Sequence, residues 1–245
     1  MKFSSPLLQF AQLSIVVGTC LAFGINDASA RTRYRPAPRG IPAQRASGGT
    51  RGEPPAFCTT GDQPMTAVSP VENLGFTTEG YPEFQWYMPE NTVSHLEFWL
   101  YEADTETGVD SPIYQTVFVT SGAEGIATLQ LPDTAGLPPL EVGQTYHWTV
   151  SAHCDIDAMQ ADMFVDGWVE RVEATPALQT QMAEAASDIE RATIAADNSL
   201  WFDAIQLLSE QIQHDPSNAE ARSELASLLE SVGLDAISTV PLLMP

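Results

Sequence analysis

The segment LEVGQTYHWTVSAHC, residues 140–154, predicts a turn followed by a β-strand. Because side chains alternate along a strand, five residues share the face that we expect to be buried: Tyr146, Trp148, Val150, Ala152 and Cys154. The spacing of Leu140, Gly143 and Tyr146 is typical of a corner between two sheets, where the tyrosine hydroxyl bonds to the backbone upstream. The segment therefore predicts one strand of a two-sheet core.

Outward from this strand, the region 58–174 repeats the same alternation. Further strands are predicted at residues 83–88, 96–101, 114–120, 125–131 and 162–172. They are rich in aromatic and β-branched residues and are separated by Pro, Gly and Asp, with residues 104–110 as a hairpin loop. This pattern predicts an antiparallel β-sandwich domain over residues 58–174. Its corner at residues 140–148 resembles the corresponding stretch of fibronectin type III domains, which implies an immunoglobulin/fibronectin-III-like sandwich.

Residues 175–245 change to a helical period and predict an α-helical tail of three helices. The first begins at Thr175-Pro176 and carries an apolar stripe that runs from Leu178 to Ala196. The second runs from Trp201 to the stop at Asp215-Pro216. A capping box over residues 217–220 opens the third, and Gly233 ends it. The predicted fold class is thus mainly β with an α tail.

The last two predicted helices resemble a tetratricopeptide repeat. Ala204, Asp215-Pro216, Leu225 and Gly233 match the small, helix-ending, leucine and glycine positions of that repeat of about 34 residues. Gln211 and Arg222 depart from it. At most one and a half repeats fit, whereas an array normally needs about three, so we expect the tail to dock on the sandwich or on a partner.

Residues 1–30 predict a cleavable signal peptide. Lys2 precedes an apolar run at residues 13–23, and Ala28-Ser29-Ala30 is a peptidase site with Ala28 and Ala30 as its small residues. The run is far shorter than the roughly 20 residues that span a bilayer, which disfavours an anchor. A lipidated Cys20 is an alternative, although Thr19 before it is larger than usual. We expect a periplasmic, cell-surface or secreted protein with no membrane span in the mature chain.

Charge is distributed unevenly. The chain has a net charge of −22, yet residues 31–52 hold six arginines and no acid. Residues 31–57 form a Pro/Gly/Arg leader that we expect to be disordered or extended. Its basic part is either solvated, folded back onto the acidic body or in contact with an anionic surface. An acidic body repels nucleic acid and anionic membranes, so we expect neither as a partner.

Two cysteines remain after the signal peptide, Cys58 and Cys154. In an exported protein two cysteines are more often bonded than free, although two buried thiols are the alternative. A bridge that closes a loop of about 96 residues would stabilise the fold by roughly 4–5 kcal/mol.

Over residues 47–243 the chain resembles an uncharacterised cyanobacterial family, domain-of-unknown-function family 928. The resemblance lies in the Gly-Gly-Thr-Arg-Gly leader, a nearby cysteine and several aromatic segments: residues 82–87, 140–148, 154–155, 164–169, 201–205 and 231–234. It implies export in such bacteria and brings no chemistry to transfer.

Residues for catalysis or metal binding do not form a known motif. His147 and His153 share a strand face but are about 20 Å apart, too far for one ion. Asp155, Asp157 and Asp162 offer oxygens for calcium, without the residue order of a known calcium loop. There is no Gly-x-Ser-x-Gly elbow, and a carboxylate pair for glycoside hydrolysis is only one of many pairings among 31 acids after residue 30. We expect no cofactor.

Trp99 and Tyr101 alternate with Phe98 and Leu100, so they face away from the predicted core. They are either covered by the tail or leader, or exposed as a surface for an envelope protein or glycan. The main hypothesis is therefore an exported, non-catalytic binding or scaffold protein. The alternative is an envelope hydrolase or calcium-dependent glycan-binding protein that uses clustered carboxylates.

Overall fold

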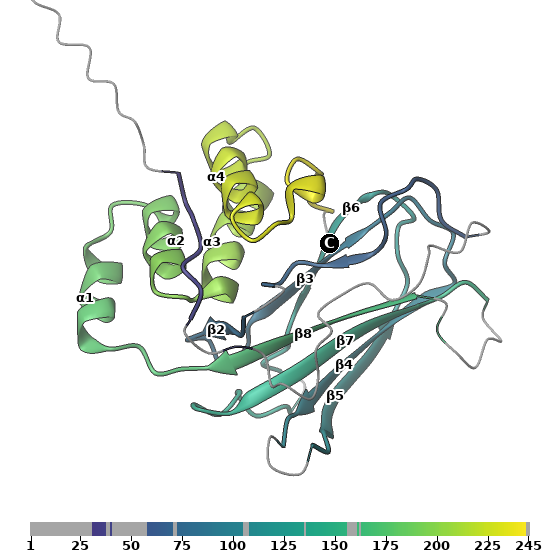
Figure 1. Ribbon diagram of the computed structural model, residues 1–245, viewed down its shortest axis with the longest axis horizontal. Coiled ribbons are helices and arrows are strands. Elements are labelled where there is room, and N and C mark those ends of the chain that lie inside the picture. The colour runs from purple at the N-terminus through teal and green to yellow at the C-terminus, as the bar shows by residue number, and fades with distance from the viewer. Residues whose placement is uncertain are drawn as a thin grey trace, which may run out of the picture. The chain divides into compact units, whose positions relative to one another are not determined.

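The computed structural model describes residues 31–37, 40, 58–70, 73–104, 108–134, 136–155, 161 and 163–243 (Figure 1). The expected signal peptide, with Cys20 and the cleavage residues Ala28 and Ala30, lies outside the described residues, as does most of the leader. Residues 31–245 form one compact unit by their internal contacts.

Eight strands in the described part of the chain form two sheets. The first has the order β1-β3-β6: β1 (Thr66–Ala67), β3 (Glu83–Met88) and β6 (Gly125–Gln130). The second has the order β2-β8-β7-β4-β5: β2 (Gly75–Thr77), β8 (Met163–Arg171), β7 (Thr145–His153), β4 (His95–Glu102) and β5 (Ser111–Phe118). The prediction of an antiparallel fold needs one correction, because β2 pairs in parallel with β8.

The inner faces of the two sheets pack as a β-sandwich. Phe84 of β3 lies 5.2 Å from Phe98 of β4 and 5.5 Å from Trp148 of β7, measured between ring centroids. These three side chains are fully buried, as the alternation of their strands predicts. Burial of such aromatic rings supplies much of the free energy of folding.

The corner before β7 has the predicted hydrogen bond. The hydroxyl oxygen of Tyr146 accepts from the backbone N–H of Glu141 at 2.8 Å, and Tyr146 is buried. Gly143 between them has φ of +84°, a left-handed conformation that glycine adopts without strain. The bond fixes the chain where it enters the five-stranded sheet.

The described part of the tail contains four α-helices, so the prediction of three is wrong. They are α1 (Pro176–Glu184), α2 (Asp188–Asp197), α3 (Trp201–His214) and α4 (Ala219–Glu230), followed by the short 3-10 helix η1 (Asp235–Ile237). The predicted first helix breaks because the Ser187 hydroxyl caps α2 by accepting from the N–H of Glu190. The carboxylate of Glu190 in turn accepts from the N–H of Ala186 at 2.7 Å.

The start of α3 attaches the helices to the sandwich. Trp201 and Phe202 are buried, and the Trp201 indole N–H donates to the carbonyl oxygen of Val68 at 3.0 Å. Phe202 lies 5.7 Å from Phe84 and so close to Gly75 that a Cβ there would meet its ring at 2.7 Å. The tail therefore docks on the sandwich, which was one of the two expected arrangements.

Residues 31–37 of the leader lie against the helices (Figure 1). The N–H of Thr32 donates to the Glu224 carboxylate at 2.5 Å, and the N–H of Tyr34 donates to the Ser231 hydroxyl at 3.0 Å. Thr32 and Tyr34 are buried, and the Tyr34 ring stands edge-on to Trp201 at 5.2 Å. These seven residues thus follow the folded-back alternative for the leader rather than the solvated one.

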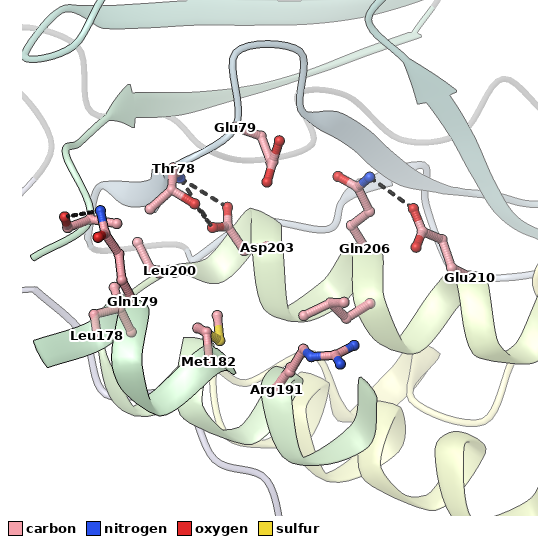
Figure 2. Close-up of a pocket in the computed structure, with 12 residues that line it drawn as sticks. Thr78, Glu79, Leu178, Gln179, Met182, Arg191, Leu200, Asp203, Gln206 and Glu210 are labelled. Carbon is pink, nitrogen blue, oxygen red and sulfur yellow. Dashed lines mark hydrogen bonds between the residues drawn. The ribbon is translucent and has the colours of Figure 1, made fainter. Parts of the chain in front are cut away.

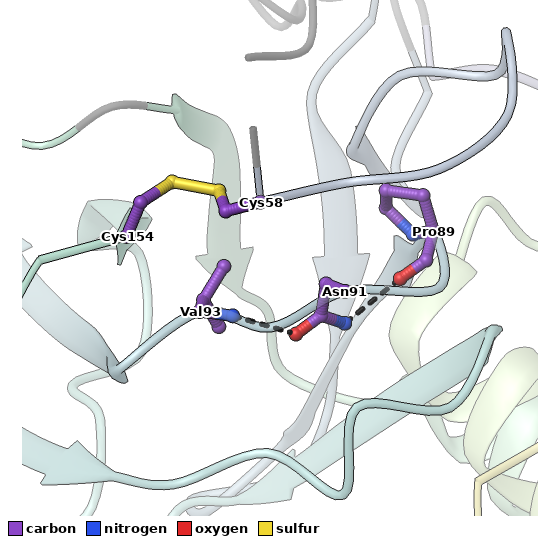
Figure 3. Close-up of a disulfide and its surroundings, with 5 residues drawn as sticks. All are labelled: Cys58, Pro89, Asn91, Val93 and Cys154. Atoms are coloured by element: carbon purple, nitrogen blue, oxygen red, sulfur yellow. Dashed lines mark hydrogen bonds between the residues drawn. A yellow bond between two sulfur atoms is a disulfide. The ribbon is translucent and has the colours of Figure 1, made fainter. Parts of the chain in front are cut away.

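Cys58 and Cys154 form a disulfide, as expected (Figure 3). Their Cα atoms are 5.8 Å apart, and the bond joins the segment before β1 to the end of β7. Beside it, the Asn91 amide donates to the Pro89 carbonyl at 2.8 Å and accepts from the Val93 N–H at 3.4 Å. The bridge therefore closes one end of the sandwich.

We expect Tyr146→Phe to lower the free energy of unfolding by about 1–2 kcal/mol, because it removes the acceptor of the Glu141 N–H. The measurement is urea-induced unfolding followed by tryptophan fluorescence. Tyr114→Phe is the matched control, since the Tyr114 hydroxyl makes no hydrogen bond within the described part of the chain. Equal losses in the two variants would show that the corner bond contributes nothing of its own.

Replacing both Cys58 and Cys154 by serine should lower the free energy of unfolding by roughly 4 kcal/mol, because the bridge restricts the unfolded chain over 96 residues. Chemical denaturation of oxidised and reduced wild type provides the comparison. Reduced wild type should match the double variant. If reduction leaves the unfolding midpoint unchanged, the bridge is not stabilising.

Candidate functional site

Four rings form a row across the outer face of the five-stranded sheet. Trp99 and Tyr101 lie on β4, His147 on β7 and Trp168 on β8, and the strand register places Tyr101 opposite His147 and His147 opposite Trp168. Successive ring centroids are 5.7, 6.0 and 4.3 Å apart. We call these four residues the outer-sheet ring row. Trp99 and Tyr101 face away from the core, as their alternation with Phe98 and Leu100 predicts.

The ring row is buried at one end and accessible at the other. Trp168 is only 2% exposed and packs with Leu74 and Ala103. Trp99 and Tyr101 are half-buried. The helices make their main sheet contacts with β2 and β3, and residues 31–37 lie on the helices, so neither covers β4 (Figure 1). The accessible end of the row therefore belongs to β4.

Carboxylates surround the row. The His147 ring lies between Asp166, at 3.1 Å from Nε2, and Asp110, at 3.4 Å from Nδ1. Beside Trp99, the Glu97 carboxylate accepts from the Gln115 amide at 2.5 Å. Each ring nitrogen of His147 therefore faces a carboxylate. Acids thus contact one ring of the row, His147, and lie beside its β4 end.

Tyr101 keeps its proton in this environment. Burial raises the pKa of the Tyr101 hydroxyl above its ordinary value, and the nearby charges of Glu97 and Asp110 raise it further. At neutral pH the hydroxyl is therefore a hydrogen-bond donor at the accessible end of the row.

The remaining histidine and aspartate candidates are separate from one another. His153 stacks on His95 at 4.5 Å and lies 3.9 Å from the Glu97 carboxylate, whereas His147 belongs to the ring row. Among the described residues, no three His, Cys, Asp or Glu side chains are arranged to hold a metal ion. Asp155 is described, but Asp157 and Asp162 lie outside the described residues, so the calcium hypothesis stays a prediction.

A pocket of about 530 Å³ lies among α1, α2, α3 and the segment after β2 (Figure 2). Its floor is aliphatic, formed by Leu178, Met182, Leu200 and Leu207. Its polar lining includes Glu79, Arg191, Gln206 and Glu210. This pocket was not predicted from the sequence, because its residues come from separate segments and form no contiguous motif.

Asp203 in this pocket has a structural role. Its carboxylate accepts from the Thr78 hydroxyl at 2.6 Å and from the Thr78 N–H at 3.1 Å (Figure 2). It also accepts from the Thr77 hydroxyl at 2.6 Å. Burial raises the pKa of Asp203 in spite of these donors. The group joins α3 to β2. The hydrolase hypothesis required an acid pair in an aromatic-lined cleft, whereas no aromatic side chain lines this pocket among the described residues.

The fold and the ring row define a two-sheet protein with a helical brace and an aromatic outer face. Residues 46–242 match the family described as Domain of Unknown Function (DUF928), and the chain belongs to that family. No curated protein matches the chain. Within the described residues, no helix has both the length and the hydrophobicity needed to cross a membrane.

Glu83 is another buried acid that no sequence motif indicates. It is 6% exposed on β3 and accepts from the Gln85 amide at 2.6 Å, while the same amide donates to the Ser209 hydroxyl of α3 at 2.7 Å. Burial raises the pKa of Glu83 to about 7, the charge of Glu210 adds to the rise, and the Gln85 bond opposes it. Ionised Glu83 is therefore unfavourable in the folded protein.

We expect Glu83→Gln to stabilise the protein above pH 7 and to have little effect near pH 4. The pKa of Glu83 is about 7 in the folded protein and 4.5 in the unfolded chain. Its contribution to the free energy of unfolding is therefore fully present below pH 4.5 and is lost as the pH rises through about 7. The gain at pH 8 should reach up to about 3 kcal/mol in urea unfolding. The exposed Glu173→Gln variant is the control, and a gain that does not depend on pH would contradict this account.

Proposed function

We propose that this protein is an exported, non-catalytic binding protein of the cyanobacterial periplasm or cell surface, and that it binds a neutral glycan at the accessible end of the ring row. Export is supported by the leader pattern of residues 1–30 and by the Cys58–Cys154 bridge, since disulfides persist in oxidising compartments. In this proposal the sandwich, of immunoglobulin/fibronectin-III-like type, carries the ligand. The tetratricopeptide-like helices brace it.

The observation that carries the proposal is the stacked pair Trp99 and Tyr101, which is half-buried beside hydrogen-bonding groups. Aromatic side chains combine a large apolar surface with a fixed orientation, and they favour contact with the C–H faces of a sugar ring. The Tyr101 hydroxyl can donate to a sugar oxygen, and the Glu97 carboxylate can accept from a sugar hydroxyl. Both groups lie on the strand that the helices leave accessible.

Charge selects the kind of glycan. Residues 53–245 hold 31 acids and three arginines. Glu97 and Asp110 lie next to the ring row, so an anionic polysaccharide would be repelled at the site itself. A neutral polysaccharide has no such penalty and offers hydroxyls to the carboxylates.

The Tyr146 corner supports the fibronectin-III-like assignment, because its hydroxyl bond has the geometry of that corner. The helices α3 and α4 support the repeat-like assignment by their length and by Gly233, whose φ is +83°. Since α3 is buried against the sandwich, we assign these helices a bracing role.

The proposal predicts that Trp99→Ala and Tyr101→Ala each weaken glycan binding at least about tenfold, because each removes a stacking surface. The full chain is tested by affinity electrophoresis in gels that contain cellulose derivatives, xylan or β-1,3-glucan. Val142→Ala is the control, because Val142 is 55% exposed and lies outside the ring row.

Retardation by none of these polysaccharides, or retardation that both variants retain, would remove the proposal. Loss of retardation with a chelator would instead favour the calcium-dependent alternative at Asp155, Asp157 and Asp162. Trp99-dependent capture of a protein, without retardation by any glycan, would replace the glycan by a protein partner.

A further inference from the structure

The edge strands of the two sheets differ in how far other parts of the backbone cover them. On β2, the N–H of Phe76 donates to the Ser199 carbonyl at 3.3 Å. On β6, Ile126 donates to the Pro241 carbonyl at 2.9 Å and accepts from the Leu243 N–H at 2.8 Å. The edge strand β1 is only two residues long. Three of the four sheet edges are therefore covered or very short.

The fourth edge, β5, is long and uncovered in the described part of the chain. It has eight residues and pairs with β4 along one side. In an antiparallel sheet, alternate residues of an edge strand point their N–H and C=O groups outward. Among the described residues, no backbone hydrogen bond joins β5 to a segment other than β4. Pro112 has no N–H, and the pairing with β4 shifts register between Pro112 and Tyr114, so the regular edge is residues 114–118.

This edge carries no charge. Residues 111–123 contain no Asp, Glu, Lys or Arg, although the whole chain has a net charge of −22. Exposed edge strands are usually protected from pairing by charged side chains. Here Val117 of β5 and Val119, just after the strand, are instead 56% and 78% exposed. The strand has the composition of one that pairs with another strand.

We propose that β5 pairs antiparallel with β5 of a second copy of this chain, so that the two five-stranded sheets join across a two-fold axis. Two acidic bodies repel each other, and β5 itself brings no charged side chain into a contact between them. A basic partner would be drawn to an acidic strand, whereas an uncharged strand suits an identical uncharged strand.

A symmetric contact of this kind is self-complementary and closes as a dimer. With the two-fold axis at Val117, that residue faces its own counterpart, and Val119 lies beside Gln115 of the second copy. Both exposed valines then become covered. A contact formed by one edge strand of each copy buries an area at the lower end of the range for specific interfaces. The dimer is therefore reversible and dissociates on dilution. This proposal does not depend on the glycan proposal.

Sedimentation velocity of the full chain over a range of concentrations tests the dimer. We expect wild type to dimerise, and Val117→Asp and Val119→Asp each to weaken dimerisation at least about tenfold, because each places a charge in the contact. Val142→Asp makes the same change at a valine that is 55% exposed outside β5 and should leave dimerisation unchanged. Added salt should strengthen the wild-type dimer by screening acidic repulsion.

Three results would overturn the proposal. The first is a wild type that stays monomeric up to about millimolar concentration. The second is a dimer that Val142→Asp weakens as much as Val117→Asp does. The third is hydrogen exchange in which the β5 amides gain protection only when envelope extract is added, which would assign the edge to a foreign strand. All three variants change exposed residues, and circular dichroism checks that they fold.

Discussion

The insertion of Trp201 and Phe202 between the helices and the sandwich is the contact on which the architecture depends. These two side chains complete a core that the sheets alone leave open, since Phe202 meets Phe84 and occupies the space beside Gly75. The next residue, Asp203, satisfies the donors of Thr77 and Thr78 at the end of β2. One turn of helix thus supplies both apolar packing and polar satisfaction. The sandwich and the tail are therefore one cooperative structure.

The acidity of the chain has different effects in different places. Most carboxylates in the described part of the chain are exposed, and there they limit the choice of partners. Glu83 and Asp203 are buried beside the contact between the helices and the sheets, and burial raises the pKa of both. Donors such as Gln85 and Thr78 reduce this cost without removing it. The protein thus contains acids that contact His147 on the outer face of the sheet. It also contains buried acids whose ionised form is unfavourable.

The sequence predicted those parts of the fold that a local pattern determines. Alternation located β7 and the outward direction of Trp99, and the spacing at residues 140–148 predicted the Tyr146 bond. The break at Ser187 was missed because an apolar stripe continues across it, although Ser187 and Glu190 have the spacing of a capping box. β2 was missed because it has only three residues and pairs with a distant strand. The ring row needed the register of β4, β7 and β8, which no single strand contains.

The parallel pairing of β2 with β8 affects the order in which the chain can fold. Thr77 forms a hydrogen bond with Asp203, which is 126 positions later in the sequence, and Thr32 forms one with Glu224, which is 192 positions later. The first strands therefore cannot reach their final environment while the chain is still emerging from a ribosome. Contacts between such distant positions slow folding and leave partly built sheets exposed.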